Sequence, residues 1–595
     1  MHSSGHILVT AVGLSLLASA VYAGHATSAE QTILRADSNK SWVFDKDTSK
    51  SGIATTSHDR DSWDFDEEPP ANSTTNLVFN TASSLLLHWP NTRYRNGHTV
   101  VPATIPVGTL LYHGSSTKRI PTGPEWVATD HDHAYTYCRS IGENNSGCWH
   151  LTLVVTGPLK LLYFDGSSAA KMEGGPLDAQ DLITWGRVEP DMVWQEQERI
   201  ARLCKWGEQY GLDGFLRMSV DFEIMLCEFH AKVEPISFLN ILSADSGAPN
   251  DTIEHHAQGP PLAVNLNATQ KPLLVQSLFR CLESGSWYND SPDPRIKIDY
   301  ASLISFYDSK LFPSLQGGRL KKNASRLSHN LATISGADTR TFHRTLDNIL
   351  RSAQRNPSGI DWQSQFKVIT NAYADRLEVL HYLLINATTT SNTLAGGSEA
   401  KTNETLKQTH RHISTMIGPF VLYKFIPPQN TDNVSAANLT WATPIFKLCA
   451  RTRAEYIETK LHEKLTYSEL LLLNSLKDVS KEICRVLVGL WAEGIDSGLY
   501  EPGASSRHLR QVQQYPRARH SALDLANKWR GKIEKLMDWL DWTVWLRCPS
   551  NCSFEEMCYL PTWPFFFRND EADPQPRCIR KVESFEFKDP DELLL

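Results

Sequence analysis

The sequence predicts an α+β protein built from three successive parts. Between residues 86 and 240, short strand-like apolar runs alternate with one or two helical stretches. Between residues 276 and 547, apolar side chains instead recur at steps of three and four, which is the spacing of helices that bury one face. From residue 548 to the end, the chain is rich in cysteine, proline and aromatic residues. We therefore expect a sheet-containing domain, an all-α helical domain and a disulfide-rich C-terminal tail.

Length and charge narrow the class of protein. A chain of 595 residues is longer than one hydrophobic core usually serves, so two or more domains are expected. The formal net charge of -8 argues against a nucleic-acid partner, because such proteins usually present a basic face.

The N-terminus resembles a secretory signal peptide over residues 1–23. An apolar run from Ile7 to Ala20 is shorter than a membrane span and is followed by Val21-Tyr22-Ala23, which suits a signal peptidase. No Lys or Arg precedes the run, so an uncleaved anchor is the alternative. Residues 24–85 are expected to form a flexible lead-in. No later segment reaches membrane-spanning length, so we expect no membrane span after signal removal.

Asn-x-Ser/Thr sequons support export to an extracellular, cell-wall or lumenal location. Twelve of the 28 asparagines begin such a sequon, where about five are expected from the usual frequencies of Ser and Thr. The predicted glycosylation sites are Asn72, Asn144, Asn250, Asn267, Asn323, Asn403, Asn433 and Asn438.

The 11 cysteines agree with an oxidising compartment. Cys548, Cys552, Cys558 and Cys578 lie in a terminal segment that is too short for a core of its own, so disulfides are the expected stabiliser. A zinc site is the alternative, but the spacing lacks the paired C-x-x-C of zinc modules. Cys138 and Cys148 are close enough in sequence for a local bridge.

The predicted elements follow one another without a repeat. The first domain, residues 86–240, contains the strand-like runs Thr109–Tyr112, Glu125–Thr129, Leu151–Val155, Leu159–Phe164, Phe215–Met218 and Glu223–Phe229. Residues 241–275 are polar and read as a linker. The helical domain, residues 276–547, includes the stripe Trp362, Phe366, Ile369, Tyr373, Leu377, Leu380 and Leu384. Such a stripe indicates helix-bundle core, and the tail occupies residues 548–595.

Two strand-like runs carry a polar residue that a core strand does not require. His113 ends the first run, directly before Gly114, and Glu223 lies inside the last. Between them, Asp130 is placed to cap a helix that contains Tyr135. His131 and His133 flank that start, but no clear third ligand accompanies them, so we expect no metal site.

These motifs resemble the ADP-ribosyltransferase superfamily. The resemblance rests on Tyr112-His113-Gly114-Ser115, on a Trp-containing strand that leads into a helix with Ala134-Tyr135, and on Gly211-Leu212-Asp213-Gly214-Phe215 followed by the Glu223 strand. It covers roughly residues 100–235 and implies a split mixed sheet. The whole chain also resembles a group of uncharacterised secreted fungal proteins.

The resemblance implies NAD as substrate and an acceptor of unknown identity. It assigns NAD-binding roles to His113, Gly114 and an aromatic residue, and catalysis to Glu223 together with His113. Tyr135 or Trp126, with Tyr137 as a further candidate, would provide the aromatic wall. A fixed carboxylate suits this chemistry, because cleavage of the nicotinamide–ribose bond builds positive charge on the sugar. We therefore expect His113 and Glu223 to face each other across an NAD-sized cleft.

Two departures leave other interpretations open. The chain lacks a clear Ser-Thr-Ser strand, and Asp221 and Glu228 compete with Glu223 for the role of the acid. The rival interpretation is a non-enzymatic secreted or cell-wall glycoprotein that uses a degenerate domain for interaction, since folds outlast activities.

Overall fold

The computed structural model describes most of the chain. The described residues are 34–36, 42–44, 62–138, 148–241, 279–319, 325–352, 358–389, 398–427, 439–499, 521–548, 552–564, 566–567, 573–581 and 593–594. Residues 1–61 and 62–595 form two compact units. In the first, β1 (Leu34–Ala36) pairs antiparallel with β2 (Trp42–Phe44). The predicted signal peptide and most of the predicted linker lie outside the described residues.

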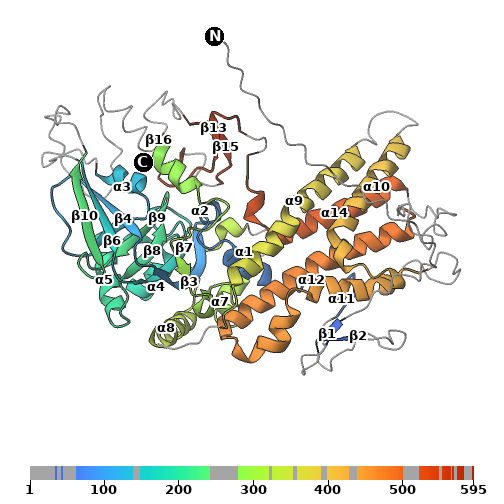
Figure 1. The fold of residues 1–595 in the computed structure, drawn as a ribbon, viewed down its shortest axis with the longest axis horizontal. Helices are drawn as coiled ribbons and strands as arrows, with labels where there is room; N and C mark the ends of the chain where they lie inside the picture. The colour runs from blue at the N-terminus through green and yellow to red at the C-terminus, as the bar shows by residue number, and fades with distance from the viewer. Residues whose placement is uncertain are drawn as a thin grey trace, which may run out of the picture. The chain divides into compact units, whose positions relative to one another are not determined.

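A ten-stranded mixed sheet organises the first half of the second unit (Figure 1). Its main path runs in the order β10-β6-β4-β5-β9-β8-β7-β3-β11, and β12 pairs with β3. All the neighbours are antiparallel except β7 and β8, whose parallel connection passes through α4 and α5. The strands are β3 (Asn96–Ile105), β4 (Leu110–Ser115), β5 (Glu125–Ala128), β6 (Trp149–Val155), β7 (Leu159–Gly166), β8 (Gly214–Met218), β9 (Phe222–Leu226), β10 (Val233–Asn240), β11 (Lys297–Ile298) and β12 (Ile304–Ser305).

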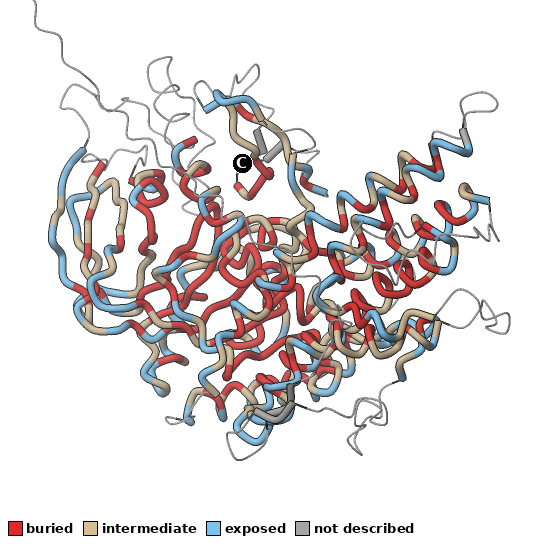
Figure 2. Tube along the Cα trace, turned by 45° about the vertical axis from the view of Figure 1, so that its right-hand side comes forward, coloured by how far each residue is buried: buried red, intermediate tan, exposed pale blue. Residues whose placement is uncertain are grey.

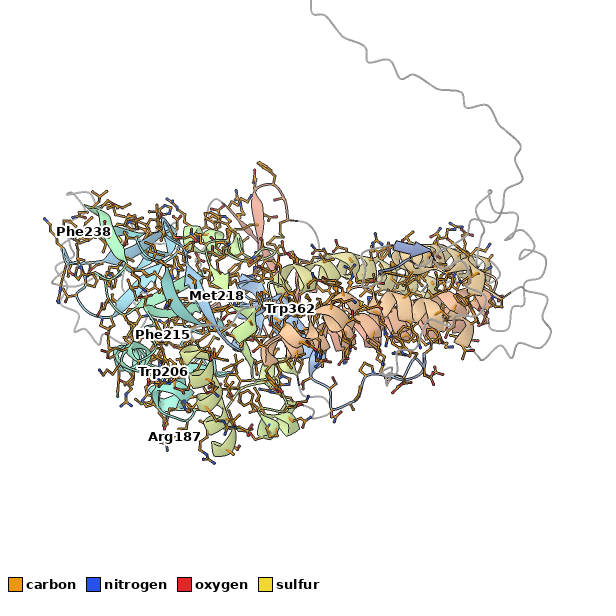
Figure 3. The ribbon with its side chains drawn as sticks, turned by 60° about the horizontal axis from the view of Figure 1, so that its bottom comes forward. Arg187, Trp206, Phe215, Met218, Phe238 and Trp362 are labelled. Carbon is orange, nitrogen blue, oxygen red and sulfur yellow. A yellow bond between two sulfur atoms is a disulfide. The ribbon has the colours of Figure 1, made fainter. Side chains whose placement is uncertain are left out.

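One face of the sheet packs against its own set of helices. Leu162, Phe215 and Met225 leave their strands on this face and contact the apolar side chains of α4 (Asp178–Thr184), α5 (Glu196–Glu208), α7 (Pro313–Arg319) and α8 (Gly336–Arg351). Trp206 of α5 lies beside Phe215 of β8, with ring centroids 6.3 Å apart (Figure 3). Alternate residues of the same strands, such as Leu216, point to the other face and belong to a different cluster.

The other face shares its core with the long helices. This second cluster includes residues of α1 (Thr75–Ser83), α9 (Trp362–Thr389), α10 (Ser398–Ile417), α11 (Thr443–Arg451), α12 (Tyr467–Asp496) and α14 (Ala522–Leu540). The whole stripe predicted from Trp362 to Leu384 is buried on α9, so its assignment to core is confirmed. Figure 2 shows buried residues in both the strands and the helices. None of the helices in the described part of the chain is long and apolar enough to cross a membrane.

The predicted α+β class is confirmed, but two predicted domain boundaries and the division into separate sheet and helical domains are wrong. The predicted lead-in, residues 24–85, extends too far, because residues 75–83 form α1, which buries Val78 and Phe79. The predicted all-α domain, which begins at residue 276, begins too early. In the structure β11 and β12 pair with β3, and α7 and α8 cover the sheet. The sheet and the helices also do not form separate units, since one hydrophobic cluster includes both. Two-residue strands carry too short a pattern to be recognised in the sequence.

The prediction that the chain carries disulfides is confirmed. Three bridges join predicted cysteines: Cys138–Cys148, Cys548–Cys558 and Cys552–Cys578. The zinc alternative is wrong for the tail cysteines, because their sulfur atoms are used in these bonds. Two further bridges, Cys204–Cys227 and Cys449–Cys484, were not predicted, and Cys281 is a buried free thiol. In the tail, β13 (Glu556–Tyr559) pairs with β15 (Arg577–Arg580), so that the bridges join a small hairpin-like unit.

Candidate functional site

The three strands that carry the predicted residues are neighbours in the sheet. β5 lies between β4 and β9, with Tyr112 opposite Ala128 and Ala128 opposite Glu223. Directly paired residues project from the same face of a sheet. The row therefore places Tyr112, Ala128 and Glu223 on one face, and Arg217 of β8, which pairs with Glu223, extends the same row.

His113 leaves the sheet on the opposite face, so it does not face Glu223 as predicted. It follows Tyr112 in the strand, and successive strand residues point to opposite faces. Its Nδ1 lies 2.7 Å from the backbone oxygen of Trp126, and its ring meets Phe229 edge-on at 5.7 Å between centroids. Burial lowers the pKa of His113. The β9 residues that share its face, such as Ile224, are apolar and fully buried, so no acid of β9 faces this histidine.

Gly114 has a packing role, because it lets the following helix approach β4. A Cβ on Gly114 would collide with the carbonyl oxygen of Ala134 in α3 (His131–Tyr137), so glycine lets the helix approach the strand. Tyr135, the predicted aromatic wall, is half-buried on α3. The α3 side chain that reaches Glu223 is instead His133, which is buried with its Nε2 4.0 Å from Glu223 Oε2. Neither ring nitrogen of His133 has a hydrogen-bond partner among the described residues.

Glu223 is the end of a buried chain of charges. Arg217 donates from Nε to Glu223 and from an Nη atom to Glu196 of α5, and Glu196 also pairs with Lys171. The side chains of Arg217 and Glu223 are only 5% and 6% exposed. The guanidinium lies over the ring of Trp126, 5.6 Å from its centroid. Trp126 therefore shares the face of Glu223 but contacts its counter-charge.

Burial and the neighbouring charges shift the pKa values of Glu196 and Lys171. Burial alone would raise the pKa of Glu196, but the charges of Arg217 and Lys171 lower it to about 2. Burial lowers the pKa of Lys171 to about 8, an effect that Glu196 opposes. Removal of one partner from a buried ion pair of this kind destabilises the fold, because the other charge is left without compensation.

The competing acids occupy different environments. Asp221 is fully buried, and burial together with the neighbouring Asp130 raises its pKa well above the usual value. The Asp130 carboxylate does not cap α3 as predicted, because it pairs with Arg295 at 2.7 Å and accepts a hydrogen bond from Tyr288. Glu228 lies beyond the end of β9 and is exposed.

The sequence contains one indication of this charge network that the predictions above do not include. Arg217 interrupts the apolar run of β8, and a charge in a buried strand needs a partner. Lys171 and Glu196 lie outside the strand-like runs, and only the fold brings them next to Arg217.

Comparisons with known proteins agree with part of the resemblance. Residues 69–148 and 139–335 match the model of a family described as the YPL277C N-terminal domain. The chain is 25% identical over 573 residues to "Uncharacterized protein YOR389W" of Saccharomyces cerevisiae, which covers 84% of this chain and 82% of that protein. It is 28% identical over 390 residues to "Uncharacterized protein YPL277C" of the same yeast, covering 54% and 76% respectively.

No solved structure matches the chain. The two yeast matches confirm the predicted similarity to uncharacterised fungal proteins, whereas the relationship to ADP-ribosyltransferases stays a prediction.

Proposed function

We propose that this protein acts as a non-enzymatic glycoprotein of the secretory pathway, the cell surface or the cell wall, whose sheet region serves in interaction. One observation carries the proposal: His113 and Glu223 project from opposite faces of the sheet, and Glu223 is paired with Arg217. A single dinucleotide lying on one face of this sheet would not contact both side chains.

The chemistry of NAD cleavage supports the same choice. A carboxylate that stabilises a developing sugar cation must have its charge directed at the substrate. Here one oxygen of Glu223 accepts a charge-assisted hydrogen bond from Arg217, and the side chain is almost completely buried. Its charge is therefore balanced within the protein before any substrate arrives, which suits a structural role.

The location follows from cysteine and sequon chemistry. Five disulfides persist most readily in an oxidising compartment. Of the predicted glycosylation sites, Asn72 and Asn403 lie in the described residues, and both are exposed, as an N-glycan requires. The other six lie outside the described residues.

Transfer of ADP-ribose from NAD, or hydrolysis of NAD, is the second candidate. It is favoured by the adjacency of β4, β5 and β9 and by the placement of Trp126 and Glu223 on one face. This version would use His133 in place of His113 as the neighbour of the acid.

An NAD glycohydrolase assay separates the two candidates. We expect purified protein to release no nicotinamide above the buffer rate, and Glu223→Gln to leave that result unchanged. Glu228→Gln is the matched control, because Glu228 is an exposed acid just outside the same strand. Turnover that is lost in Glu223→Gln and kept in Glu228→Gln, with both variants still folded, would establish the enzyme instead.

A further inference from the structure

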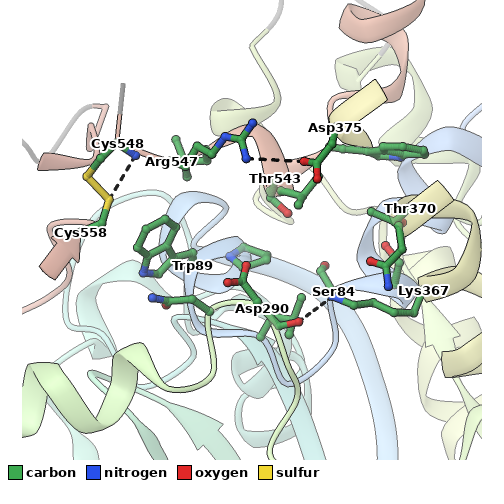
Figure 4. A pocket seen from close by; sticks show the side chains of 18 of the residues that line it. Ser84, Trp89, Asp290, Lys367, Thr370, Asp375, Thr543, Arg547, Cys548 and Cys558 are labelled. Carbon is green, nitrogen blue, oxygen red and sulfur yellow. Dashed lines mark hydrogen bonds and ion pairs between the residues drawn. A yellow bond between two sulfur atoms is a disulfide. The ribbon is translucent and has the colours of Figure 1, made fainter. Parts of the chain in front are cut away.

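A second site lies away from the sheet, where α2, α9, the turn η11 and the disulfide tail meet. A cavity of about 600 Å³ opens between α2 (His88–Arg93), α9, the 3-10 helix η11 (Thr543–Trp545) and residues 546–548 and 552–558. Figure 4 shows Trp89 and Asp290 on one side of it and Arg547 and Asp375 on the other. The volume falls within the roughly 300–1,000 Å³ typical of small-ligand sites.

The lining combines an aromatic face with many hydrogen-bonding groups. Trp89 is half-buried and supplies a flat apolar wall. On α9, Lys367, Thr370 and Asn371 recur at helical spacing and present one polar face to the cavity. Asn371 is exposed, so its amide is accessible from solvent.

The charges of the lining disfavour an anionic ligand. Arg547 is already paired with Asp375 at 3.5 Å and with Glu378, and Lys367 donates to the backbone oxygen of Asp290 at 2.6 Å. The lining holds three carboxylates, those of Asp290, Asp375 and Glu556, against these two cations. Phosphate groups, including those of NAD, would meet a surplus of negative charge here.

We propose that this cavity binds a neutral carbohydrate of one or two sugar units. The C–H face of a sugar ring packs against an indole such as that of Trp89, because both are apolar. Sugar hydroxyls donate to carboxylates and accept from amides, and the lining offers both groups. The inference goes beyond the proposed function, because it names a ligand class for a site that the sheet does not contain.

The disulfides give the site its outer wall. Cys548, Cys552 and Cys558 line the cavity beside Glu556 and Met557, and both tail bridges end in this segment. Because the segment has no core of its own, the bridges hold the wall in position. Binding should therefore depend on the oxidised state of the tail.

Calorimetric titration of the full, enzymatically deglycosylated protein tests the proposal. The probes are maltose, cellobiose, mannobiose and N,N′-diacetylchitobiose, with NAD as the anionic comparison. We expect at least one disaccharide to bind and NAD not to bind at the same site. Trp89→Ala should weaken that binding at least tenfold. The matched control is Trp194→Ala, which removes an exposed tryptophan outside the cavity and should leave affinity unchanged.

A second variant keeps the test informative if Trp89→Ala fails to fold. Asn371→Ala removes an exposed amide from a helix surface, so it should weaken binding without altering the melting temperature. Mild reduction of the tail bridges should also reduce affinity. The proposal is overturned if no disaccharide binds the folded protein at millimolar concentration, if both cavity variants bind normally, or if NAD competes with the sugar. Because binding is measured without turnover, detection of NAD cleavage would overturn the proposed function and leave this result standing.

Discussion

The substitution Arg217→Met tests whether Glu223 is a structural partner. The methionine side chain keeps much of the volume of arginine but removes its charge, so two buried carboxylates, Glu196 and Glu223, lose their shared partner. Lys171 still compensates Glu196, whereas the remaining ion-pair partner of Glu223 among the described residues is His133, at 4.0 Å. Breaking a buried ion pair by removing one partner typically costs about 3–5 kcal/mol. We expect a loss of unfolding free energy in that range at pH 7.

The pKa of Glu196, which Arg217 and Lys171 lower together, supplies an upper limit for the part of this loss that comes from Glu196, and a pH window. Its value falls from 4.5 to about 2 in the folded protein, which corresponds to about 3 kcal/mol of preference for the ionised form. A depressed carboxyl pKa contributes stability that is present above the unfolded value and is lost as pH falls toward the folded value. The difference between the native protein and Arg217→Met should therefore be full above about pH 4.5 and shrink as the pH approaches 2.

Urea denaturation followed by tryptophan fluorescence is the assay. Arg202→Met is the matched control, because Arg202 pairs with Glu198 on the same helix as Glu196, with side chains 49% and 44% exposed. An exposed pair of this kind is worth about 0–1 kcal/mol. The double variant Arg217→Met/Glu223→Gln should recover part of the loss, since it removes the unpaired charge. If Arg217→Met costs no more than Arg202→Met, the structural account of Glu223 is refuted.

Three further predictions concern other parts of the molecule. Gly114→Val should lower the melting temperature by several degrees and Gly123→Val should not, because a Cβ on Gly114 meets a backbone oxygen of α3 whereas a Cβ on Gly123 meets no atom within 4 Å; equal melting temperatures would contradict the packing role. Burial lowers the pKa of His410 to about 4, so the unfolded state binds the proton first and unfolding free energy should fall by up to about 3 kcal/mol between pH 6.5 and 4. His410→Gln should flatten that slope, and an unchanged slope would count against the assignment. Treatment of native protein with an N-glycosidase should increase its electrophoretic mobility, and no shift with residues 1–23 still present would exclude export.

The sequence allowed prediction of elements whose periodicity is visible within one segment. The stripe on α9 spans many turns, and the runs that became β4, β7, β8 and β9 are apolar enough to identify locally. Two-residue strands such as β12, and the membership of α8 in the sheet packing, depend on contacts between distant segments. The same holds for Cys204–Cys227 and Cys449–Cys484, because cysteine spacing does not determine connectivity.

The sequence did not predict from which face of the sheet His113 projects. Residue types and their order placed His113, Trp126 and Glu223 on three strands that do prove to be adjacent. Which face a side chain takes depends on the pairing register, and a shift of one residue exchanges the faces. The register sets Tyr112, not His113, in the row of Glu223.

The identity of the residue beside an acid therefore decides what the acid can do. In a catalytic site, the positive charge opposite Glu223 would arise in the substrate during the reaction. In this sheet Arg217, the next residue in the same row, already provides a permanent positive charge. A buried acid in an apolar strand did require a reason, as the sequence indicated, and a counter-ion on the adjacent strand supplies one. Because that counter-ion comes from the neighbouring strand β8, it could be assigned only once β8 and β9 were paired.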